Sequence, residues 1–446
     1  MTIADKYTGK YFFHFTHIEN LEDILANGLL STNEKQDKSI EHVNVASSDI
    51  QCTRHEMEVT CGPKGHVHDY VPFYFNSRTP MFLSIIKSRN YDQPYFIYFA
   101  VSIDKLENEK FVFTNKAANR RYEPPTFYDC PSNLNELSWN CIESKAWSSP
   151  NENEKHKKMA EALHFKEFDL NDISYIVAWN ESVKEYVEKT FKESGVKCPP
   201  VFFDGKNGYH HYYYDFNYDR NASLVHGPEI TKDTFKSLVK RINEARKSVD
   251  TPYQFDDIED SLCAIRKDFS CIKELKGIVD LSTDNRVHSE NVEDHTRTVV
   301  KNLLESSEYQ SLDDQEKLVV EFSAYLHDIG KGPKSRWPDG KQKVDDDHPR
   351  KSAIYIERIL VEEIDSISKK QIRQIVLLVL YHDFFGDHLT SGRYLKELNS
   401  VLKSESDLNM LYALAKADVM SIQSKWYTDR VIDWKKAHKK IMETFE

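Results

Sequence analysis

The spacing of the apolar residues changes once along this chain of 446 residues. In the first part, short runs rich in aromatic and β-branched residues predict strands, for example "YFIYFAVSI" (95–103) and "KFVFT" (110–114). In the second part the spacing is helical almost without interruption, as in "KKQIRQIVLLVLYHDF" (369–384). Because one hydrophobic core rarely serves a chain of this length, at least two domains are expected. We predict an α+β protein, with a mixed α/β domain over residues 1–215 and an all-α helical bundle over residues 255–446.

Residues 216–254 are polar and join the two predicted domains. Within them, "TKDTFKSLVKRINEARKSV" (231–249) has the spacing of a helix, and Thr231 is its predicted N-cap because a threonine hydroxyl can accept a hydrogen bond from a first-turn amide. The segment is expected to serve as a connector or a lid.

Composition and charge exclude several classes of protein. With 39% hydrophobic and 30% charged residues, the chain has the composition of a folded protein. The start lacks the layout of a signal peptide, and the longest apolar run, "IVLLVLY" (375–381), is far shorter than the roughly 20 residues of a membrane span. Seven irregularly spaced cysteines suit a reducing compartment, so a cytoplasmic protein is expected. A net charge of −12 argues against a protein that coats nucleic acid, but allows a local basic groove.

Histidines and aspartates recur on separate helical segments of the second part. Imidazole and carboxylate groups bind divalent metal ions, and neighbouring residues on one helix cannot surround an ion alone. Any single histidine here is more often a structural residue, but the set as a whole favours a metal site at which several helices converge. Its members are His295, His327, Asp328, His348, His382 and Asp418.

This order of ligands, together with the string "LHDIGK" (326–331), resembles the HD-domain metal-dependent phosphohydrolases over roughly residues 255–440. The resemblance implies that one ion is held by His295, His327, Asp328 and Asp418. His348 and His382 are similar to the additional ligands of members that bind two ions. Mixed nitrogen and oxygen ligands suit manganese, iron or nickel better than calcium.

Three further polar residues lie close in sequence to these candidate ligands. Lys331 follows the His–Asp pair and could meet a phosphate oxygen of a phosphate-containing small molecule or nucleotide. Asp383 and His388 either orient a ligand imidazole or lie on the surface, and the surface is the more common place for such residues.

The first part opens with a strand pattern that carries His14 and Thr16, followed by a short amphipathic helix that Gly28 closes. A histidine on a strand that faces a cleft can bond a ribose hydroxyl, although such a histidine is more often structural. Read singly, Glu161 would be a glutamate on the surface of a helix.

An ordered series of strings over about residues 9–214 resembles the DarT family of DNA ADP-ribosyltransferases. The strings are "HFTHIENLEDIL", "GLLS", "DIQCTR", "GHVHDYVPFYFNSRTPM", "FVFTN", "LSWNCIESKAW" and "AEALHF". The resemblance implies transfer of ADP-ribose from NAD to a base in single-stranded DNA, thymidine or, in one branch, guanosine.

The same resemblance assigns roles to individual residues. It places the catalytic glutamate at Glu161 and a catalytic arginine at Arg54, and it implies that His14 and Thr16 bind NAD. We add Asn20 to the expected cofactor-binding residues, and also Tyr74, whose ring could stack on nicotinamide or on a base. A carboxylate near the ribose can stabilise the positive charge that develops when the bond to nicotinamide breaks.

Three functions remain open at this point. The first is a DNA ADP-ribosyltransferase fused to a metal-dependent phosphohydrolase, with a toxin or phage-defence role, a possible antitoxin partner and no membrane association. The second is a hydrolase of nucleotides or cyclic phosphodiesters whose first domain only recognises nucleic acid or NAD. The third is a regulatory protein with degenerate sites, and the intact residue sets argue against it.

Overall fold

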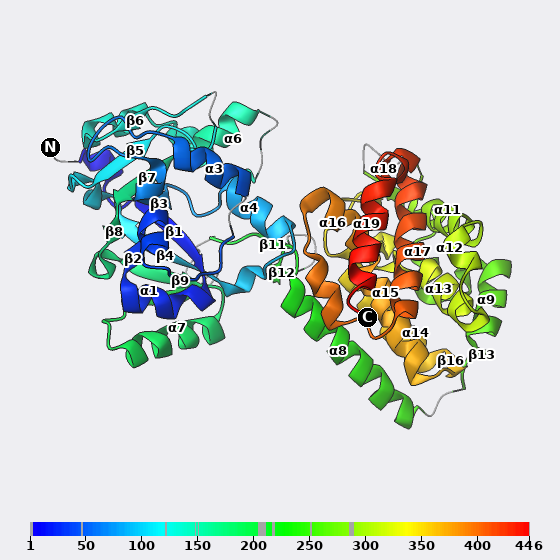
Figure 1. Cartoon of the computed structure of the whole chain (residues 1–446). Helices are drawn as coiled ribbons and strands as arrows, with labels where there is room; N and C mark the ends of the chain where they lie inside the picture. The colour runs from blue at the N-terminus through cyan, green and yellow to red at the C-terminus, as the bar shows by residue number, and fades with distance from the viewer. Residues whose placement is uncertain are drawn as a thin grey trace. The chain divides into compact units, whose positions relative to one another are not determined.

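The computed structural model describes residues 3–45, 48–120, 123–147, 149, 151–203, 211–215, 219–249, 252–284 and 290–445. The chain forms two compact units (Figure 1). The first comprises Met1–Lys87 and Tyr91–Leu224, and the second comprises Ser88–Asn90 and Val225–Glu446. The division therefore falls inside the segment predicted as the connector.

An eight-stranded sheet organises the first unit, in the order β10-β9-β4-β1-β3-β7-β5-β6. Its strands pair antiparallel except for β9 and β10, which are parallel. The strands are β1 (Tyr11–His17), β3 (Tyr70–Tyr74), β4 (Phe96–Ser102), β5 (Phe111–Thr114), β6 (Phe127–Tyr128), β7 (Glu161–Phe165), β9 (Tyr175–Ala178) and β10 (Val201–Phe203). The strands predicted at 95–103 and 110–114 are confirmed as β4 and β5.

Aromatic side chains fill the core on one face of this sheet. The ring of Phe12 meets the rings of Phe73 and Phe111 edge to face, with centroids 5.2 and 5.3 Å apart. Such pairs add to the free energy gained by burying the rings. Helices α1 (Leu21–Asn27) and α7 (Glu181–Ser194) pack against each other. Figure 1 shows them beside the sheet, with α3 (Ser48–Glu56), α4 (Pro80–Lys87) and α6 (Glu152–Lys158) elsewhere around it.

Gly28 ends α1, as the sequence predicts. Its φ of 88° lies in the region that favours glycine, and a Cβ there would stand 2.6 Å from Oε1 of Glu167. Glu167 belongs to β8 (Glu167–Phe168), which pairs with β2 (Leu29–Leu30) directly after the turn. The glycine thus lets the chain leave the helix and enter this short strand pair.

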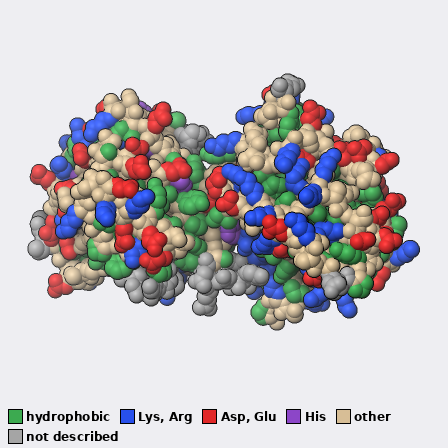
Figure 2. Space-filling model, turned by 90° about the horizontal axis from the view of Figure 1, so that it is seen from below, with side chains coloured by type: hydrophobic (Ala, Val, Ile, Leu, Met, Phe, Trp, Pro, Cys, Tyr) green, Lys and Arg blue, Asp and Glu red, His purple; other side chains and the backbone are tan. Residues whose placement is uncertain are grey.

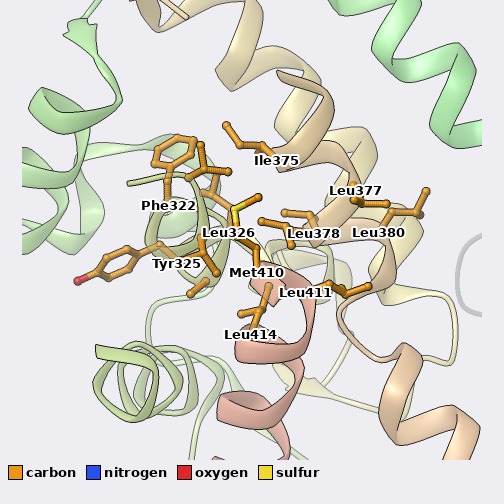
Figure 3. Close-up of a cluster of buried hydrophobic side chains, with 14 of the residues drawn as sticks. Phe322, Tyr325, Leu326, Ile375, Leu377, Leu378, Leu380, Met410, Leu411 and Leu414 are labelled. Atoms are coloured by element: carbon orange, nitrogen blue, oxygen red, sulfur yellow. The ribbon is translucent and has the colours of Figure 1, made fainter. Parts of the chain in front are cut away.

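The described residues of the second unit are mainly helical, with two short strand pairs: β13 (Phe255–Asp257) with β16 (Ile364–Ser366), and β14 (Ser282–Thr283) with β15 (Lys341–Gln342). Helices α15 (Lys369–Tyr381) and α17 (Glu405–Ile422) lie in its core because most of their side chains are apolar and buried. Figure 3 shows side chains that meet there, among them Phe322, Leu326, Leu378, Met410 and Leu411. The main helices are α9 (Ile258–Lys267), α11 (Val292–Leu304), α13 (Asp314–Leu326), α14 (His348–Glu362), α15 (Lys369–Tyr381), α16 (Phe384–Ser391), α17 (Glu405–Ile422) and α19 (Val431–Met442).

The helix predicted in the connector is α8 (Pro228–Ala245), and it packs on α14 and α15. Its buried stripe of Phe235, Leu238 and Ile242 joins the core of the second unit. The predicted N-cap was wrong, because the helix starts three residues earlier, after Gly227 and with Pro228 in its first turn. Thr231 instead donates its hydroxyl hydrogen to the carbonyl of Gly227.

The predicted α+β class is confirmed, with a mixed α/β unit followed by a helical one. On the face seen in Figure 2, acidic and basic side chains are interspersed over both units. Within the part of the chain that the structure describes, no helix is both long and apolar enough to cross a membrane.

His164 gives the first unit a testable dependence on pH. It lies on β7 between the rings of Phe111 and Phe168, with centroids 4.7 and 5.3 Å away. Burial, with a smaller contribution from Lys110, lowers the pKa of His164 from 6.5 to about 4. The unfolded chain therefore binds this proton more tightly, so the stabilising contribution is present above pH 6.5 and is lost as the pH falls to 4.

We expect a His164→Phe variant to lose less stability than the native protein between pH 6.5 and pH 4. The difference is on the order of 3 kcal/mol in the free energy of unfolding, since one pKa unit corresponds to about 1.4 kcal/mol. Hydrogen exchange of β7 peptides at both pH values measures it, and peptides of α11 in the other unit are the control. Equal pH dependence of β7 in the two proteins would contradict this account.

Candidate functional site

Glu161 is the first residue of β7, and it pairs across the sheet with Tyr74 of β3. Its side chain is 1% exposed, so the helix-surface position that it would have if read singly is wrong. A carboxylate buried to this degree needs partners.

Arg54 near the end of α3 supplies the opposite charge. Its Nη1 lies 3.0 Å from Oε1 and 2.9 Å from Oε2 of Glu161, and it also donates to the carbonyl of Ala118. Burial lowers the pKa of Arg54, but the carboxylate of Glu161 outweighs this effect and raises it. The structure thus brings the two predicted catalytic residues together as a buried ion pair.

The loop after β5 closes over this pair. The main-chain amide of Ala118 donates to Oε1 of Glu161 at 2.9 Å, and the amide of Glu161 donates to the hydroxyl of Thr114. Oε2 of Glu161 is buried and has no hydrogen-bond partner within the described residues. The sequence analysis missed Ala118, because a main-chain contact across 43 positions leaves no signal in side-chain chemistry.

The predicted cofactor-binding residues fall into two groups. Tyr74 stacks on Phe15, with ring centroids 6.2 Å apart, and lies beside Glu161 in the sheet. Because side chains alternate along a strand, His14 and Thr16 point to the opposite face of β1 from Phe15. The structure therefore brings Tyr74, but not His14 or Thr16, next to the buried ion pair.

His14 lies where the sheet opens between β1 and β3. These neighbouring strands are paired at Phe13 and Tyr74, whereas β1 pairs with β4 along its whole length. The carbonyl of Pro72 on β3 accepts a hydrogen bond from Nδ1 of His14 at 2.8 Å. Burial lowers the pKa of His14 to about 4, so the imidazole is neutral near pH 7.

Asn20 ties a loop to the end of the same strand. Its Nδ2 donates to the Thr16 hydroxyl and to the carbonyl of Val43, and its Oδ1 accepts from the amide of Val43. Thr16 and Asn20 are therefore joined directly by a hydrogen bond.

The metal-ligand candidates of the second unit converge from separate helices, as the sequence predicts. They are His295 on α11, His327 and Asp328 after α13, His348 at the start of α14, His382 after α15, and Asp418 on α17. Three overlapping groups of them have ligand atoms within 4.8 Å of one another.

Asp328 lies at the centre and uses its two oxygens differently. Oδ2 is 3.3 Å from Nε2 of His295 and 3.4 Å from Nε2 of His327, whereas Oδ1 is 3.2 Å from Nε2 of His348. Asp418 lies on the side of the first pair, with Oδ1 3.1 Å from Nε2 of His295. The carboxylate of Asp328 thus faces two neighbouring sets of ligands.

Main-chain carbonyls orient three of the imidazoles. Nδ1 of His327, His348 and His382 donates to the carbonyl three residues earlier, at 2.7, 2.8 and 2.8 Å. Each Nε2 is then directed into the cluster as a potential ligand atom.

The donor set fits a divalent cation. Nε2 of His327, Oδ1 of Asp328 and Oδ1 of Asp418 are buried without a hydrogen-bond partner among the described residues. Burial lowers the pKa of His327, but Asp328 and Asp418 outweigh this effect and raise it to about 10. A proton on His327 therefore balances the buried carboxylates here, and a metal ion can replace it, whereas burial lowers the pKa of His382.

Two residues near the cluster differ in their placement. Asp383 has an oxygen 3.4 Å from Nε2 of His348 and another 3.4 Å from Nε2 of His382, so the surface position favoured for it was wrong. The string "HD" at 382–383, which repeats 327–328, was the available signal. His388 points its Nδ1 to the carbonyl of Arg393 instead.

Lys331 and Gly330 complete the turn after the His–Asp pair. Nζ of Lys331 lies 2.5 Å from Oδ2 of Asp328, at the edge of the cluster. Gly330 lies so close to α14 that a Cβ would stand 2.3 Å from the amide nitrogen of Ser352. Glycine therefore allows the turn to approach the helix that begins with His348.

Comparison with known proteins agrees with this division. Residues 13–214 match the family described as ssDNA thymidine ADP-ribosyltransferase, DarT, and residues 287–419 match the HD domain. A DNA ADP-ribosyl transferase of Thermus aquaticus is 31% identical over 195 residues, which are 42% of this chain and 84% of that protein. One from Thermus sp. 2.9 is 32% identical over 188 residues, which are 41% of this chain and 87% of that protein.

Solved structures are similar over the same part. Thermus sp. 2.9 DarT in complex with ADP-ribosylated ssDNA is 29% identical, with a TM-score of 0.42, and the match covers 47% of this chain and 100% of that one. The same protein in complex with NAD+ is 28% identical, with a TM-score of 0.39 and the same coverage. The sequence matches show that the chain belongs to the DarT family of DNA ADP-ribosyltransferases through its N-terminal half, and that its C-terminal half contains an HD domain, a family of metal-dependent hydrolases.

Proposed function

We propose that the first unit transfers ADP-ribose from NAD to a thymidine or guanosine base in single-stranded DNA, and that the second unit hydrolyses a phosphate ester. The observation that carries the first part is the buried contact between Arg54 and Glu161, at the end of strand β7 and under the loop after β5. The DNA and NAD complexes of the Thermus protein support these two substrates.

In this reaction the bond between nicotinamide and ribose C1′ breaks, and its electrons leave with the nicotinamide nitrogen. The positive charge that develops on the ribose is stabilised by the carboxylate of Glu161. A base nitrogen then bonds to C1′, and its proton passes to Glu161, whose Oε2 has no hydrogen-bond partner among the described residues. Nη1 of Arg54 lies 3.0 Å from Oε1 and 2.9 Å from Oε2, so its positive charge stands beside both oxygens of the carboxylate.

His14, Thr16 and Asn20 would bind the cofactor at the opening between β1 and β3. Because Nδ1 of the neutral His14 donates to Pro72, its Nε2 is left as an acceptor for a ribose hydroxyl. Tyr74 would position the nicotinamide or the target base by stacking, on the other face of β1.

We expect Glu161→Gln to lower the rate of transfer at least a hundredfold, because loss of a preorganised charge costs roughly 3 kcal/mol in the transition state. The measurement is nicotinamide release from NAD, with mass spectrometry of four single-stranded oligonucleotides that each contain one kind of base. Glu136→Gln, an exposed glutamate in the same unit, is the matched control.

A Glu161→Gln protein with near-native transfer would remove Glu161 from the mechanism. No adduct on any of the four oligonucleotides, with native protein, would favour the alternative in which the first unit only recognises nucleic acid or NAD. An adduct on one base identifies the target, which the sequence leaves open.

In the second unit, His295, His327, Asp328 and Asp418 would hold one divalent ion. His348 and His382, with Asp383, would hold a second one, and Asp328 would contribute one oxygen to each. When bound, two such ions lower the pKa of water and neutralise charge on a phosphoryl group. Lys331 could turn from Asp328 toward a phosphate oxygen of a nucleotide or cyclic phosphodiester.

The number of ions can be tested by substitution. We expect purified protein to carry about two equivalents of manganese, iron or nickel per chain, as the ligand types favour. Asp328→Ala should lose both ions and lower the melting temperature of the helical unit, since a bound ion stabilises the state that holds it. His348→Ala should lose only one. Elemental analysis of the native protein and the two variants measures the number of ions that each one holds.

Native protein with one equivalent or none would contradict the two-ion site. Retention of both ions by Asp328→Ala would show that this carboxylate does not join the two sets of ligands.

The biological role follows from the chemistry. Bulky adducts on DNA bases stall replication, so we propose a toxin or phage-defence protein that an antitoxin could restrain. All seven cysteines, each in the described part of the chain, are free thiols, which supports a cytoplasmic location.

A further inference from the structure

A cavity of about 470 Å³ lies in the second unit, at the end of α16 that is far from the metal-ligand cluster. Its walls come from the C-terminal end of α16, the segment that follows, and the last turn of α19. Volumes of about 300–1,000 Å³ are typical of sites for small molecules. Neither the transferase chemistry nor the metal cluster uses this space.

The cavity carries unbalanced positive charge. Lys396 and Lys440 line it, and within the described residues neither is ion-paired with a carboxylate. Arg393 also contributes to the wall, but both Glu397 oxygens accept its hydrogen bonds, at 2.7 and 2.8 Å, and Asp387 accepts another. None of the described lining residues is acidic. Two ammonium groups thus remain to attract an anion of two negative charges.

The rest of the wall suits an aromatic group. Tyr394, with 44% of its surface exposed, lines the cavity together with Leu395 and Ile441. Nζ of Lys396 lies 5.5 Å from the centre of the Tyr394 ring. The ring of Tyr394 therefore lies next to the ammonium group of Lys396. This arrangement suits a ligand in which an aromatic ring is close to an anionic group.

Polar groups that can orient a ligand lie on the same wall. Asn399 and Thr444 line the cavity with an amide and a hydroxyl. The Thr444 hydroxyl donates to the carbonyl of Ile441 and lies 3.5 Å from Oδ1 of Asn399, so the donor for a ligand is Nδ2 of Asn399. His388 lines it too, and because its Nδ1 donates to the carbonyl of Arg393, its Nε2 is the acceptor of the neutral ring. His388 is therefore part of the cavity wall and does not belong to the groups of candidate metal ligands.

We propose that this cavity binds a nucleoside monophosphate, with the base against Tyr394 and the phosphate between Lys396 and Lys440. The site is separate from the metal cluster, but α16 joins them. Asp383, the N-cap of α16, contacts His348 and His382, while the other end of the helix forms the cavity wall. A ligand in the cavity would thus bind at the far end of the helix that presents Asp383 to the metal ligands.

Equilibrium dialysis of the full chain with labelled AMP in the presence of EDTA tests the proposal, because phosphate binding at a metal cluster would require the ion. We expect one AMP per chain. The double variant Lys396→Glu/Lys440→Glu should bind AMP at least tenfold more weakly, and Tyr394→Ala about tenfold more weakly, as loss of base stacking predicts.

Lys425→Glu/Lys435→Glu is the matched control, because it changes the net charge equally at exposed lysines outside the cavity and should bind AMP as the native chain does. Unchanged AMP binding by the Lys396→Glu/Lys440→Glu variant would overturn the site. Inorganic phosphate that displaces AMP at equal concentration, together with no effect of Tyr394→Ala, would overturn the assignment to a nucleotide.

Discussion

Burial of the Asp328 carboxylate is the constraint on which the helical unit depends. A carboxylate that is 1% exposed is tolerated only where positive or hydrogen-bonding groups surround it. Here the imidazoles of His295, His327 and His348 and the ammonium of Lys331 do so, and they come from separate elements. The end of α13 must therefore meet the start of α14 and the first turn of α11, and the apolar core around α15 and α17 holds them there.

In the first unit, one arginine supplies the positive charge beside the buried carboxylate. Glu161 is as deeply buried as Asp328, and Arg54 and the amide of Ala118 share one of its oxygens. Nη1 of Arg54 also lies 2.9 Å from the other oxygen. In both units, then, a carboxylate is buried at the end of an apolar element and lies against positively charged groups from other elements.

The sequence predicted both candidate sites, but the reasons differ between the two units. Ligands such as His327 and Asp328 interrupt strongly apolar helical patterns, so their number and order indicate convergence. The N-terminal site could be predicted only by resemblance, because Arg54 and Glu161 are 107 positions apart and their contact depends on tertiary structure. The same limit explains the missed contact of Ala118. Thr231 was mistaken for an N-cap because Pro228, which starts α8, lies before the periodic residues.

Removal of the metal tests most directly whether transfer depends only on the buried pair of Arg54 and Glu161. The full chain is treated with EDTA until elemental analysis finds no ion, and nicotinamide release from NAD is then measured with single-stranded DNA. The account predicts the rate of the untreated protein, because Arg54 and Glu161 belong to the first unit and the candidate metal ligands belong to the second. A rate that falls with the metal content and recovers when manganese is returned, or no release by the untreated protein, would contradict it.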